Sequence, residues 1–242
     1  MDPLITVLIA TYNQATYLPE ALQSLEAQTL PASAFEILVI NDGSTDETSE
    51  VLEGYANWVR VIERENQGLA PTCQEGLQEA RGEFFARLDS DDMVHADWLQ
   101  TLLDALEAHP NACCAYSDRY LLERGRRRRV DAEAKNLYTL EGCGTLFRTE
   151  AVRRVGGYRN LFWEEYDLYL RLRTEGDFVH VPRPLYFYRQ HQDNMTNSLK
   201  SRRNGWIELA EVWDASVLRA VGRDADLEDA LGSLNEGAQN GT

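Results

Sequence analysis

The sequence predicts an α/β fold built on a mostly parallel sheet flanked by helices, with a helical extension at the C-terminus. Two observations lead to this class. Short β-branched runs alternate with longer amphipathic runs through the first half of the 242 residues. The runs 4–10 and 35–40 are almost wholly apolar, as strands covered by helices on both faces must be. Alternation of strand and helix at this spacing is typical of a Rossmann-like sheet.

The first half contains four predicted strands, each followed by a predicted helix. We expect strands at 4–10, 35–40, 59–63 and 84–88, and helices at 17–27, 46–55, 69–80 and 96–108. The sequence Ser44-Thr45-Asp46-Glu47 suits the start of the second helix, because its side chains can cap free amides and favour the helix dipole. His109-Pro110 ends the fourth helix.

The second half is less regular. It predicts strands at 114–117, 144–147, 178–181 and 185–188, and a hairpin or loop at 120–130 that carries Arg126–Arg129. Helices are expected at 149–155, where Gly156-Gly157 ends the helix, and at 165–174. A polar, mobile loop is expected at 190–203, an amphipathic helix at 206–221, and a frayed segment over the last twenty residues.

The charge balance limits the possible partners. The chain has 24 Lys and Arg against 40 Asp and Glu, a formal net charge of −16. Such a surface repels nucleic acid and anionic lipid on average, so we expect no nucleic-acid partner. If the substrate is itself an anion, an arginine cluster or a bound metal ion must offset the negative potential of the protein at the binding site.

The cysteines and the N-terminus favour a cytoplasmic protein. Cys73, Cys113, Cys114 and Cys143 contain no Cys-x-x-Cys pair, which favours reduced thiols over a zinc site or a disulfide framework. Met1-Asp2-Pro3 lacks the basic start of a signal peptide, and no apolar stretch approaches the length of a membrane span.

Three polar clusters follow predicted strands, at Thr11–Asn13, Asn41–Ser44 and Asp89–Asp92. Ligands bind outside the carboxyl ends of parallel strands, so these clusters are expected to meet. Helix capping is nearly as good an explanation for Asp42, but it accounts for at most one of Asp89, Asp91 and Asp92. A divalent cation would offset the repulsion among these carboxylates, and oxygen ligands favour Mg²⁺ or Mn²⁺ over zinc.

That cation would complete its shell with water and substrate phosphates, so an acidic cleft could bind an anionic diphosphate. A dinucleotide or P-loop site is excluded, because the chain lacks both Gly-x-Gly-x-x-Gly after the first strand and Gly-Lys-Ser/Thr.

A series of segments from Leu4 to His191 resembles the family-2 inverting glycosyltransferases of GT-A fold. The segments are VLIATYN at 7–13, VINDGSTDET at 39–48, NQGLA at 66–70, ARGEFFARLDSDD at 80–92, FWEEYDLYLRL at 162–172 and YRQH at 188–191. The resemblance implies one domain at 1–203, with a nucleotide-binding half about 1–118 and an acceptor-side half about 119–203. Residues 204–242 lie outside it, as a C-terminal helix and flexible tail.

The resemblance also implies roles for particular residues. Those that match nucleotide-sugar-binding positions are Thr11, Tyr12, Asn13, Asp42, Arg87, Asp89 and Ser90. A packing role for Tyr12 and a structural ion pair for Arg87 remain alternatives. The residues implied to hold Mn²⁺ or Mg²⁺ are Asp89, Asp91 and His191, with Asp91 the better candidate for direct contact. Asp92 either joins them or caps a helix beginning near Val94.

The catalytic base is expected near residue 165. The family commonly has Glu-Asp before a helix, where this chain has Glu164-Glu165. Helical spacing places Glu165 beside the apolar stripe, where partial burial raises a carboxyl pKa and suits a base. Asp167 would face Arg171 in a surface ion pair and is the reserve candidate. Acidic residues are also common at any helix start, which is the alternative explanation.

The remaining candidates lie around the acceptor. Glu164 is expected to contact the acceptor or cap the helix, and Trp163 to form a platform for an acceptor sugar or to pack in the core. Gly142 and Gly144 would allow close backbone approach near the donor sugar. The cations expected either to clamp phosphates or to be solvated are Lys200, Arg202 and Arg203. Arg126–Arg129 is either a solvated loop or a contact with an anionic membrane or partner.

The predicted activity is therefore metal-dependent, inverting transfer of one sugar from an NDP-sugar, with UDP favoured as the nucleotide. The expected acceptor is a hydroxyl group of a saccharide or of a lipid-linked molecule. The expected role is synthesis of a cell-surface polysaccharide or glycoconjugate. A non-catalytic nucleotide-sugar-binding subunit and a sugar-1-phosphate nucleotidyltransferase are the alternatives. Peripheral membrane association and a homodimer remain open.

Overall fold

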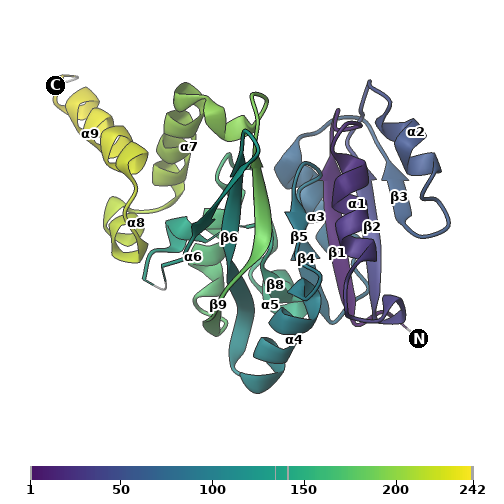
Figure 1. The fold of residues 1–242 in the computed structure, drawn as a ribbon. Helices are drawn as coiled ribbons and strands as arrows, with labels where there is room; N and C mark the ends of the chain where they lie inside the picture. The colour runs from purple at the N-terminus through teal and green to yellow at the C-terminus, as the bar shows by residue number, and fades with distance from the viewer. Residues whose placement is uncertain (1, 134, 141, 241–242) are drawn as a thin grey trace.

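The computed structural model describes residues 2–133, 135–140 and 142–240 (Figure 1). Within these residues nine strands form one sheet in the order β3-β2-β1-β4-β8-β6-β9-β5, with β7 paired to β6. The architecture is the expected α/β fold, a curled sheet with helices on both faces.

The first half of the chain follows the sequence prediction closely. Four parallel strands, β1 (Ile5–Thr11), β2 (Phe35–Asn41), β3 (Arg60–Glu63) and β4 (Phe84–Arg87), alternate with α1 (Leu18–Glu26), α2 (Thr48–Glu53) and α3 (Leu69–Glu79). A short 3-10 turn, η1 (Ala32–Ala34), precedes β2. The predicted boundaries agree to within about two residues, because the apolar runs end where the polar clusters begin.

Side chains of these strands enter two cores on opposite faces of the sheet. In β1, Ile5, Val7 and Ile9 pack with α1 and α4 (Trp98–Ala108), while Leu8 packs on the other face with α3 and α6 (Glu164–Leu172). Because successive strand residues point to opposite faces, an apolar run fits only a sheet covered on both sides.

The second half extends the sheet with mixed pairing. Strand β5 (Met93–Val94) precedes α4, and β6 (Ala112–Glu123), β7 (Arg126–Val130), η2 (Leu137–Thr139), β8 (Leu146–Arg148) and α5 (Thr149–Arg154) follow it. Strand β8 is antiparallel to both β4 and β6. The two strands predicted at 178–181 and 185–188 are one continuous strand, β9 (Asp177–Gln190), parallel to β6. The register with β6 is irregular between Ser117 and Arg119, where Pro182 and Pro184 lie in β9.

The C-terminal region is more helical than predicted. After η3 (Met195–Asn197), α7 (Leu199–Val212) occupies the end of the expected loop, and the expected single helix divides into α7 and α8 (Ala215–Val221). Asp214 starts α8 by accepting a hydrogen bond from the Ser216 amide. Instead of a frayed segment, α9 (Ala225–Asn240) lies beside α7 (Figure 1).

A third core holds these helices together. Trp206 and Leu209 of α7 pack with Leu227 and Leu231 of α9, all buried. Arg202 and Arg203, for which phosphate clamps and solvated side chains were the alternatives, form ion pairs with Asp226 and Asp229 of α9. No described helix is long and apolar enough to cross a membrane.

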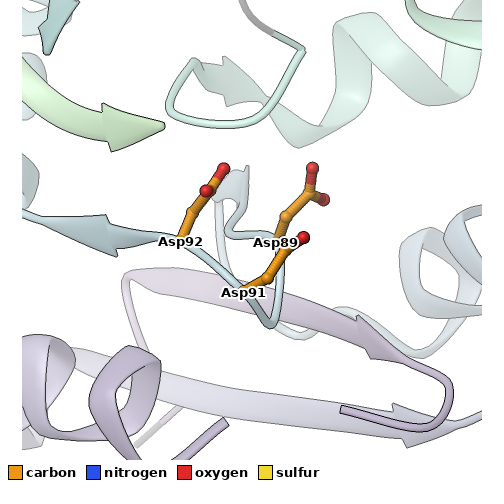
Figure 2. A group of neighbouring side chains, drawn as sticks. All are labelled: Asp89, Asp91 and Asp92. Atoms are coloured by element: carbon orange, nitrogen blue, oxygen red, sulfur yellow. The ribbon is translucent and has the colours of Figure 1, made fainter. Parts of the chain in front are cut away.

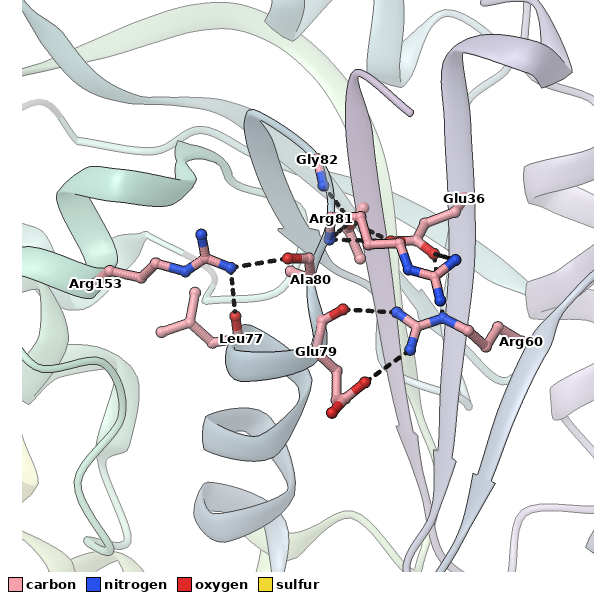
Figure 3. Close-up of polar contacts among 9 residues, drawn as sticks. Glu36, Arg60, Leu77, Glu79, Ala80, Arg81, Gly82 and Arg153 are labelled. Atoms are coloured by element: carbon pink, nitrogen blue, oxygen red, sulfur yellow. Dashed lines mark hydrogen bonds and ion pairs between the residues drawn. The ribbon is translucent and has the colours of Figure 1, made fainter. Parts of the chain in front are cut away.

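Charged side chains stabilise the edge of the sheet opposite the polar clusters. Figure 3 shows Arg60 between Glu36 and Glu79, with ion-pair distances of 3.2 and 3.0 Å. Arg60 also donates to the Glu79 carbonyl at 2.7 Å, and Arg153 donates to the Ala80 carbonyl at 2.8 Å. These cations satisfy carbonyl groups at the C-terminus of α3, where the helix dipole favours positive charge.

Candidate active site

A cavity of about 480 Å³ opens at the carboxyl ends of β1, β2 and β4. Its wall combines the loops after these strands with the start of α6 and the segment that follows β9. The polar clusters predicted to converge therefore meet at one edge of the sheet, because the strands that precede them are parallel neighbours.

Three carboxylates lie on the turn between β4 and β5. One oxygen from each of Asp89, Asp91 and Asp92 lies within 4.8 Å of the others, and Figure 2 shows the three groups directed to the same side. Asp89 and Asp91 line the cavity. The turn is closed by a hydrogen bond of 3.1 Å from the Asp92 amide to the Asp89 carbonyl.

Asp92 differs from its two neighbours. It is 1% exposed, and its two oxygens accept hydrogen bonds from the Tyr186 hydroxyl at 2.6 Å and the Arg189 amide at 2.7 Å. The alternative of a helix cap is wrong, because β5 follows and α4 begins only at Trp98. Asp92 thus anchors β9 beside the two cavity carboxylates.

The electrostatics of this turn suit a hard cation. Burial, and then the charge of Asp89, raise the pKa of Asp91, and the hydrogen bond with His191 acts in the opposite direction. His191 Nε2 lies 2.8 Å from Asp91 Oδ2, and its ring packs on Tyr17 with centroids 4.8 Å apart. Closely spaced carboxylate oxygens that repel one another, next to an imidazole, are a donor set that fits Mn²⁺ or Mg²⁺.

The loops after β1 and β2 form the side of the cavity predicted to hold a nucleotide. Thr11 is 2% exposed, and its buried Oγ1 has no hydrogen-bond partner among the described residues. Tyr12 is 47% exposed and lines the cavity, so the alternative of a packing aromatic is wrong. The Tyr12 ring is therefore accessible to a ligand, and Thr11 is a buried residue of the same wall with an unpaired hydroxyl.

Asp42 lines the same wall of the cavity, and neighbouring backbone amides and Arg64 fix the position of its carboxylate. Its two oxygens accept from the amides of Gln67 and Gly68 at 3.0 and 2.8 Å, and Arg64 Nε lies 3.0 Å from Oδ1. The Asn-Gln-Gly segment noted in the sequence thus positions a carboxylate of the site, a role that the sequence did not reveal.

Asn13, which was expected to contact the nucleotide, bonds in this structure to the loop that follows β2. Its Oδ1 accepts hydrogen bonds from the amides of Thr45 at 2.7 Å and Asp46 at 3.3 Å, and Asn13 is not among the described residues that line the cavity. Its φ of +54° turns the chain at the end of β1. Asn13 therefore joins the first two loops rather than facing the site.

Arg87 forms the floor of the cavity. It is 3% exposed, donates to Glu164 at 2.7 Å and to the Cys143 sulfur at 2.9 Å, and lies 3.4 Å from Asp89. The structural ion pair considered for Arg87 is confirmed, while the residue still lines the cavity next to Ser90. Glu164 is 2% exposed, is bound to Arg87 and lines the cavity. It does not cap α6, because Trp163 occupies the N-cap position, and its contact with an acceptor stays a prediction.

Glu165 lies in the first turn of α6 and lines the cavity. Burial, and then the neighbouring Glu164 carboxylate, raise the pKa of Glu165 well above its usual range, although Arg87 opposes this. A Cβ added to Gly142 would lie 2.6 Å from Glu165 Cβ. Gly142, expected beside a donor sugar, therefore leaves room for the carboxylate that is the candidate base.

Asp167 forms the predicted ion pair with Arg171, but the pair is buried and does not lie at the surface. It is 0% exposed, accepts from Arg171 Nη2 at 2.6 Å and from Trp213 Nε1 at 2.8 Å, and lies 3.3 Å from Arg159. It is not among the described residues that line the cavity. The Asp167–Arg171 pair of α6 is covered by the C-terminal region through Trp213. The i,i+4 spacing alone could not show this contact.

An aromatic cluster forms the wall above α6. Trp163 lines the cavity and is 7% exposed, stacked on Tyr166 with ring centroids 5.2 Å apart and tilted against Trp206 at 5.4 Å. Trp163 therefore both packs against other aromatic residues and lines the cavity, so both alternatives apply. Sequence reasoning missed other lining residues, Met195 and Thr196, because nothing in their pattern distinguishes them from a polar loop.

Paired aspartates and a half-buried carboxylate share one cavity at the edge of this sheet, which is the arrangement expected from the resemblance to glycosyltransferases of GT-A fold. The chain matches the family model described as "Glycosyl transferase family 2" over residues 6–169, more than half of its length. It belongs to glycosyltransferase family 2.

Curated relatives agree with this assignment. The chain is 27% identical over 205 residues to chondroitin synthase of Escherichia coli, covering 79% of this chain and 30% of that protein. It is also 27% identical over 205 residues to hyaluronan synthase of Pasteurella multocida, covering 79% and 21%. The chain thus spans less than a third of the length of these two relatives.

Two solved structures share the fold. One is TarS residues 1–349 of S. aureus in complex with UDP-GlcNAc, with a TM-score of 0.71, 20% identity, and coverage of 95% of this chain and 72% of that chain. The other is the mannosyltransferase PcManGT of Pyrobaculum calidifontis in complex with GDP-Man and Mn²⁺, with a TM-score of 0.72, 18% identity, and coverage of 100% and 77%.

Proposed function

We propose that this glycosyltransferase is metal-dependent and inverting, and that it moves one sugar from a UDP-sugar to a hydroxyl of a saccharide or lipid-linked acceptor. The observation that carries the proposal is one cavity that contains both the Asp89–Asp91 pair and Glu165. A role in cell-surface polysaccharide synthesis in the cytoplasm remains part of this proposal, in keeping with the polysaccharide synthases among the relatives.

In this proposal the donor occupies the side of the cavity formed by β1 and β2. The exposed ring of Tyr12 is placed to stack on the nucleotide base, and the unpartnered Thr11 hydroxyl to bond the base or ribose. Asp42 accepts a hydrogen bond from an N–H or O–H group of the base or ribose, and the amides of Gln67 and Gly68 hold its carboxylate in position.

Asp89, Asp91 and His191 would hold Mn²⁺ or Mg²⁺, which neutralises charge on the departing diphosphate. Glu165 takes the proton of the acceptor hydroxyl while that oxygen forms a bond to the anomeric carbon. The bond from this carbon to the diphosphate oxygen breaks on the opposite face, so an α-linked donor yields a β-linked product. A carboxylate with a raised pKa is the stronger base for this step.

Calorimetry tests the donor side of the proposal. We expect UDP to bind wild-type protein with Mn²⁺ and at least about tenfold more weakly without it. Asp91→Asn and His191→Gln should weaken Mn²⁺-dependent binding, whereas Asp97→Asn, an exposed carboxylate paired with Arg183, should not. Equal UDP affinity with and without Mn²⁺ contradicts metal dependence, and tighter binding of GDP than UDP contradicts the donor class.

A donor panel separates the enzyme from the alternative of a non-catalytic subunit. Release of free UDP in the presence of acceptor saccharides supports the enzyme, while tight donor binding with no release supports the binding subunit. Membership in glycosyltransferase family 2 decides against a sugar-1-phosphate nucleotidyltransferase.

A further inference from the structure

A basic hairpin lies next to the active-site cavity. Strands β6 and β7 are joined by a two-residue turn, in which Arg124 and Gly125 have φ of +48° and +75° and Glu123 pairs with Arg126. Positive φ at both positions is the tight turn whose twist matches the paired strands. The arginines of the hairpin are therefore presented on ordered backbone rather than on a mobile loop.

The two faces of this hairpin are used differently. On one face Arg129 Nη2 lies 2.6 Å from buried Asp118, and the Arg127 guanidinium lies 4.5 Å from the centre of the Tyr120 ring. Among the described residues, by contrast, Arg124, Arg126 and Arg128 have neither an ion pair nor a side-chain hydrogen bond, and all three are exposed. Three cations thus remain uncompensated in a chain with a net charge of −16.

The uncompensated face is the face of the active site. Arg128 pairs with Leu121 of β6, which pairs with Tyr188 of β9, and residues in register share one face of a sheet. Stacking of Tyr120 on Phe187 at 5.4 Å shows the same register on the opposite face. Tyr188 lines the active-site cavity, so Arg128 lies across the sheet from it on the same face.

The tip of the hairpin lies beside the proposed metal site. Glu123 pairs with Gln190, the last residue of β9, and the next residue is His191, which contacts Asp91. A hollow of about 450 Å³ on the hairpin is lined by Leu121, Glu123 and the three free arginines. An elongated ligand could therefore lie in this hollow while its end reaches the cavity.

We propose that Arg124, Arg126 and Arg128 bind an acidic saccharide chain, the acceptor, through carboxylate or phosphate groups that recur along it. The proposal rests on the proposed function, since an acceptor exists only for a transferase. Guanidinium groups bind both kinds of oxyanion through paired hydrogen bonds. Arg126 and Arg128 are two residues apart on one strand, about 7 Å, which suits a repeating anion better than a single group.

Charge complementarity explains why such a cluster is needed. An acidic chain approaching this protein meets a repulsive field and, at the cavity, the cluster of Asp89, Asp91 and Asp92. Arginines at the entrance offset that field locally. A membrane is the weaker fit, because the exposed large apolar side chains of the described residues do not include any from the hairpin.

Binding of labelled oligosaccharides tests this surface without any donor. We expect wild-type protein to bind oligogalacturonate or oligo(glycerol phosphate), with affinity that falls as salt rises, and not a neutral malto-oligosaccharide of equal length. The triple variant Arg124→Gln, Arg126→Gln, Arg128→Gln should bind at least about tenfold more weakly. UDP affinity with Mn²⁺, measured on the same samples, should be unchanged.

Two single variants provide the matched control. Arg128→Gln and Arg127→Gln remove one charge each from neighbouring positions of β7, on opposite faces. We expect a two- to fivefold loss for Arg128→Gln and none for Arg127→Gln. Three outcomes would each overturn the proposal. The first is an equal loss of affinity in Arg128→Gln and Arg127→Gln, and the second is equal affinity for the neutral and the acidic oligosaccharide. The third is binding only to vesicles made of equal amounts of phosphatidylcholine and phosphatidylglycerol. Failure of UDP binding alone would instead contradict the proposed function and leave the oligosaccharide result standing.

Discussion

At the scale of single residues, two carboxylates two positions apart have opposite environments. Glu165 lines the cavity, and no described residue forms an ion pair with it. Asp167, in contrast, is buried and contacts Arg171, Arg159 and Trp213. A group held by several donors is a poor base, since each bond favours its ionised form and leaves no lone pair for a new proton. The pair therefore predicts opposite effects of substitution.

Glu165→Gln should lower turnover about 10²- to 10⁴-fold, the range expected for loss of a general base, while UDP binding with Mn²⁺ is retained. Glu165→Asp, which restores the residue common in the family, is the matched control and should keep substantial activity. Steady-state assays of UDP release measure both. Undiminished turnover of Glu165→Gln would show that the base lies elsewhere.

The raised pKa of Glu165 also predicts a pH dependence. In unfolded protein a glutamate titrates near about 4.3, and in the folded protein at higher pH. Between the two values the folded state holds more protons, so the contribution of Glu165 to stability falls as pH rises through this window. Thermal melts should show a smaller fall for Glu165→Gln than for wild type, and kcat/KM should rise as Glu165 ionises.

Asp167→Ala should destabilise the protein by about 3–5 kcal/mol, because it leaves the buried Arg171 without its partner. Denaturant unfolding measures the change, and Glu165→Ala provides the comparison from the same helix. Equal stability of the two variants would mean that the Asp167 pair is not structural.

At the scale of elements, the C-terminal helices support the wall of the cavity that contains Trp163. Trp163, which lines the cavity, packs against Trp206 of α7, and α7 packs against α9 through the third core. The amphipathic helix predicted at 206–221 implied an apolar face directed to a core, and Trp206 and Leu209 of α7 are buried. The sequence could not show that these residues pack on α9, because the segment that forms α9 was predicted to be a frayed end.

Leu227→Ala tests whether α9 is part of the folded unit. Leu227 is 0% exposed, so truncation should cost about 2–5 kcal/mol, measured by denaturant unfolding. Leu234→Ala on the same helix, where the side chain is 39% exposed, should change stability by less than about 0.5 kcal/mol. Similar small effects for both would indicate that α9 does not pack on α7.

At the scale of the whole molecule, the net charge of −16 opposes compaction. Added sodium chloride screens exposed charges that are more than a Debye length apart, so we expect the melting temperature to rise with salt. Close ion pairs such as Arg202–Asp226 at 2.7 Å are weakened by the same salt. A melting temperature that falls with salt would show that these pairs outweigh the general repulsion.

The amino-acid sequence by itself determined the parallel half of the sheet, its helices and the position of the acidic turn. Local chemistry is sufficient there, because apolar runs, caps and polar strand ends are encoded within a few neighbouring residues. Tertiary structure alone decided that Asn13 and Asp92 hold the framework of the site, that Asp167 is buried, and that Arg126 and Arg128 share a face of the sheet with Tyr188. Those properties depend on partners far away in the chain, and no local pattern records which partner a side chain meets.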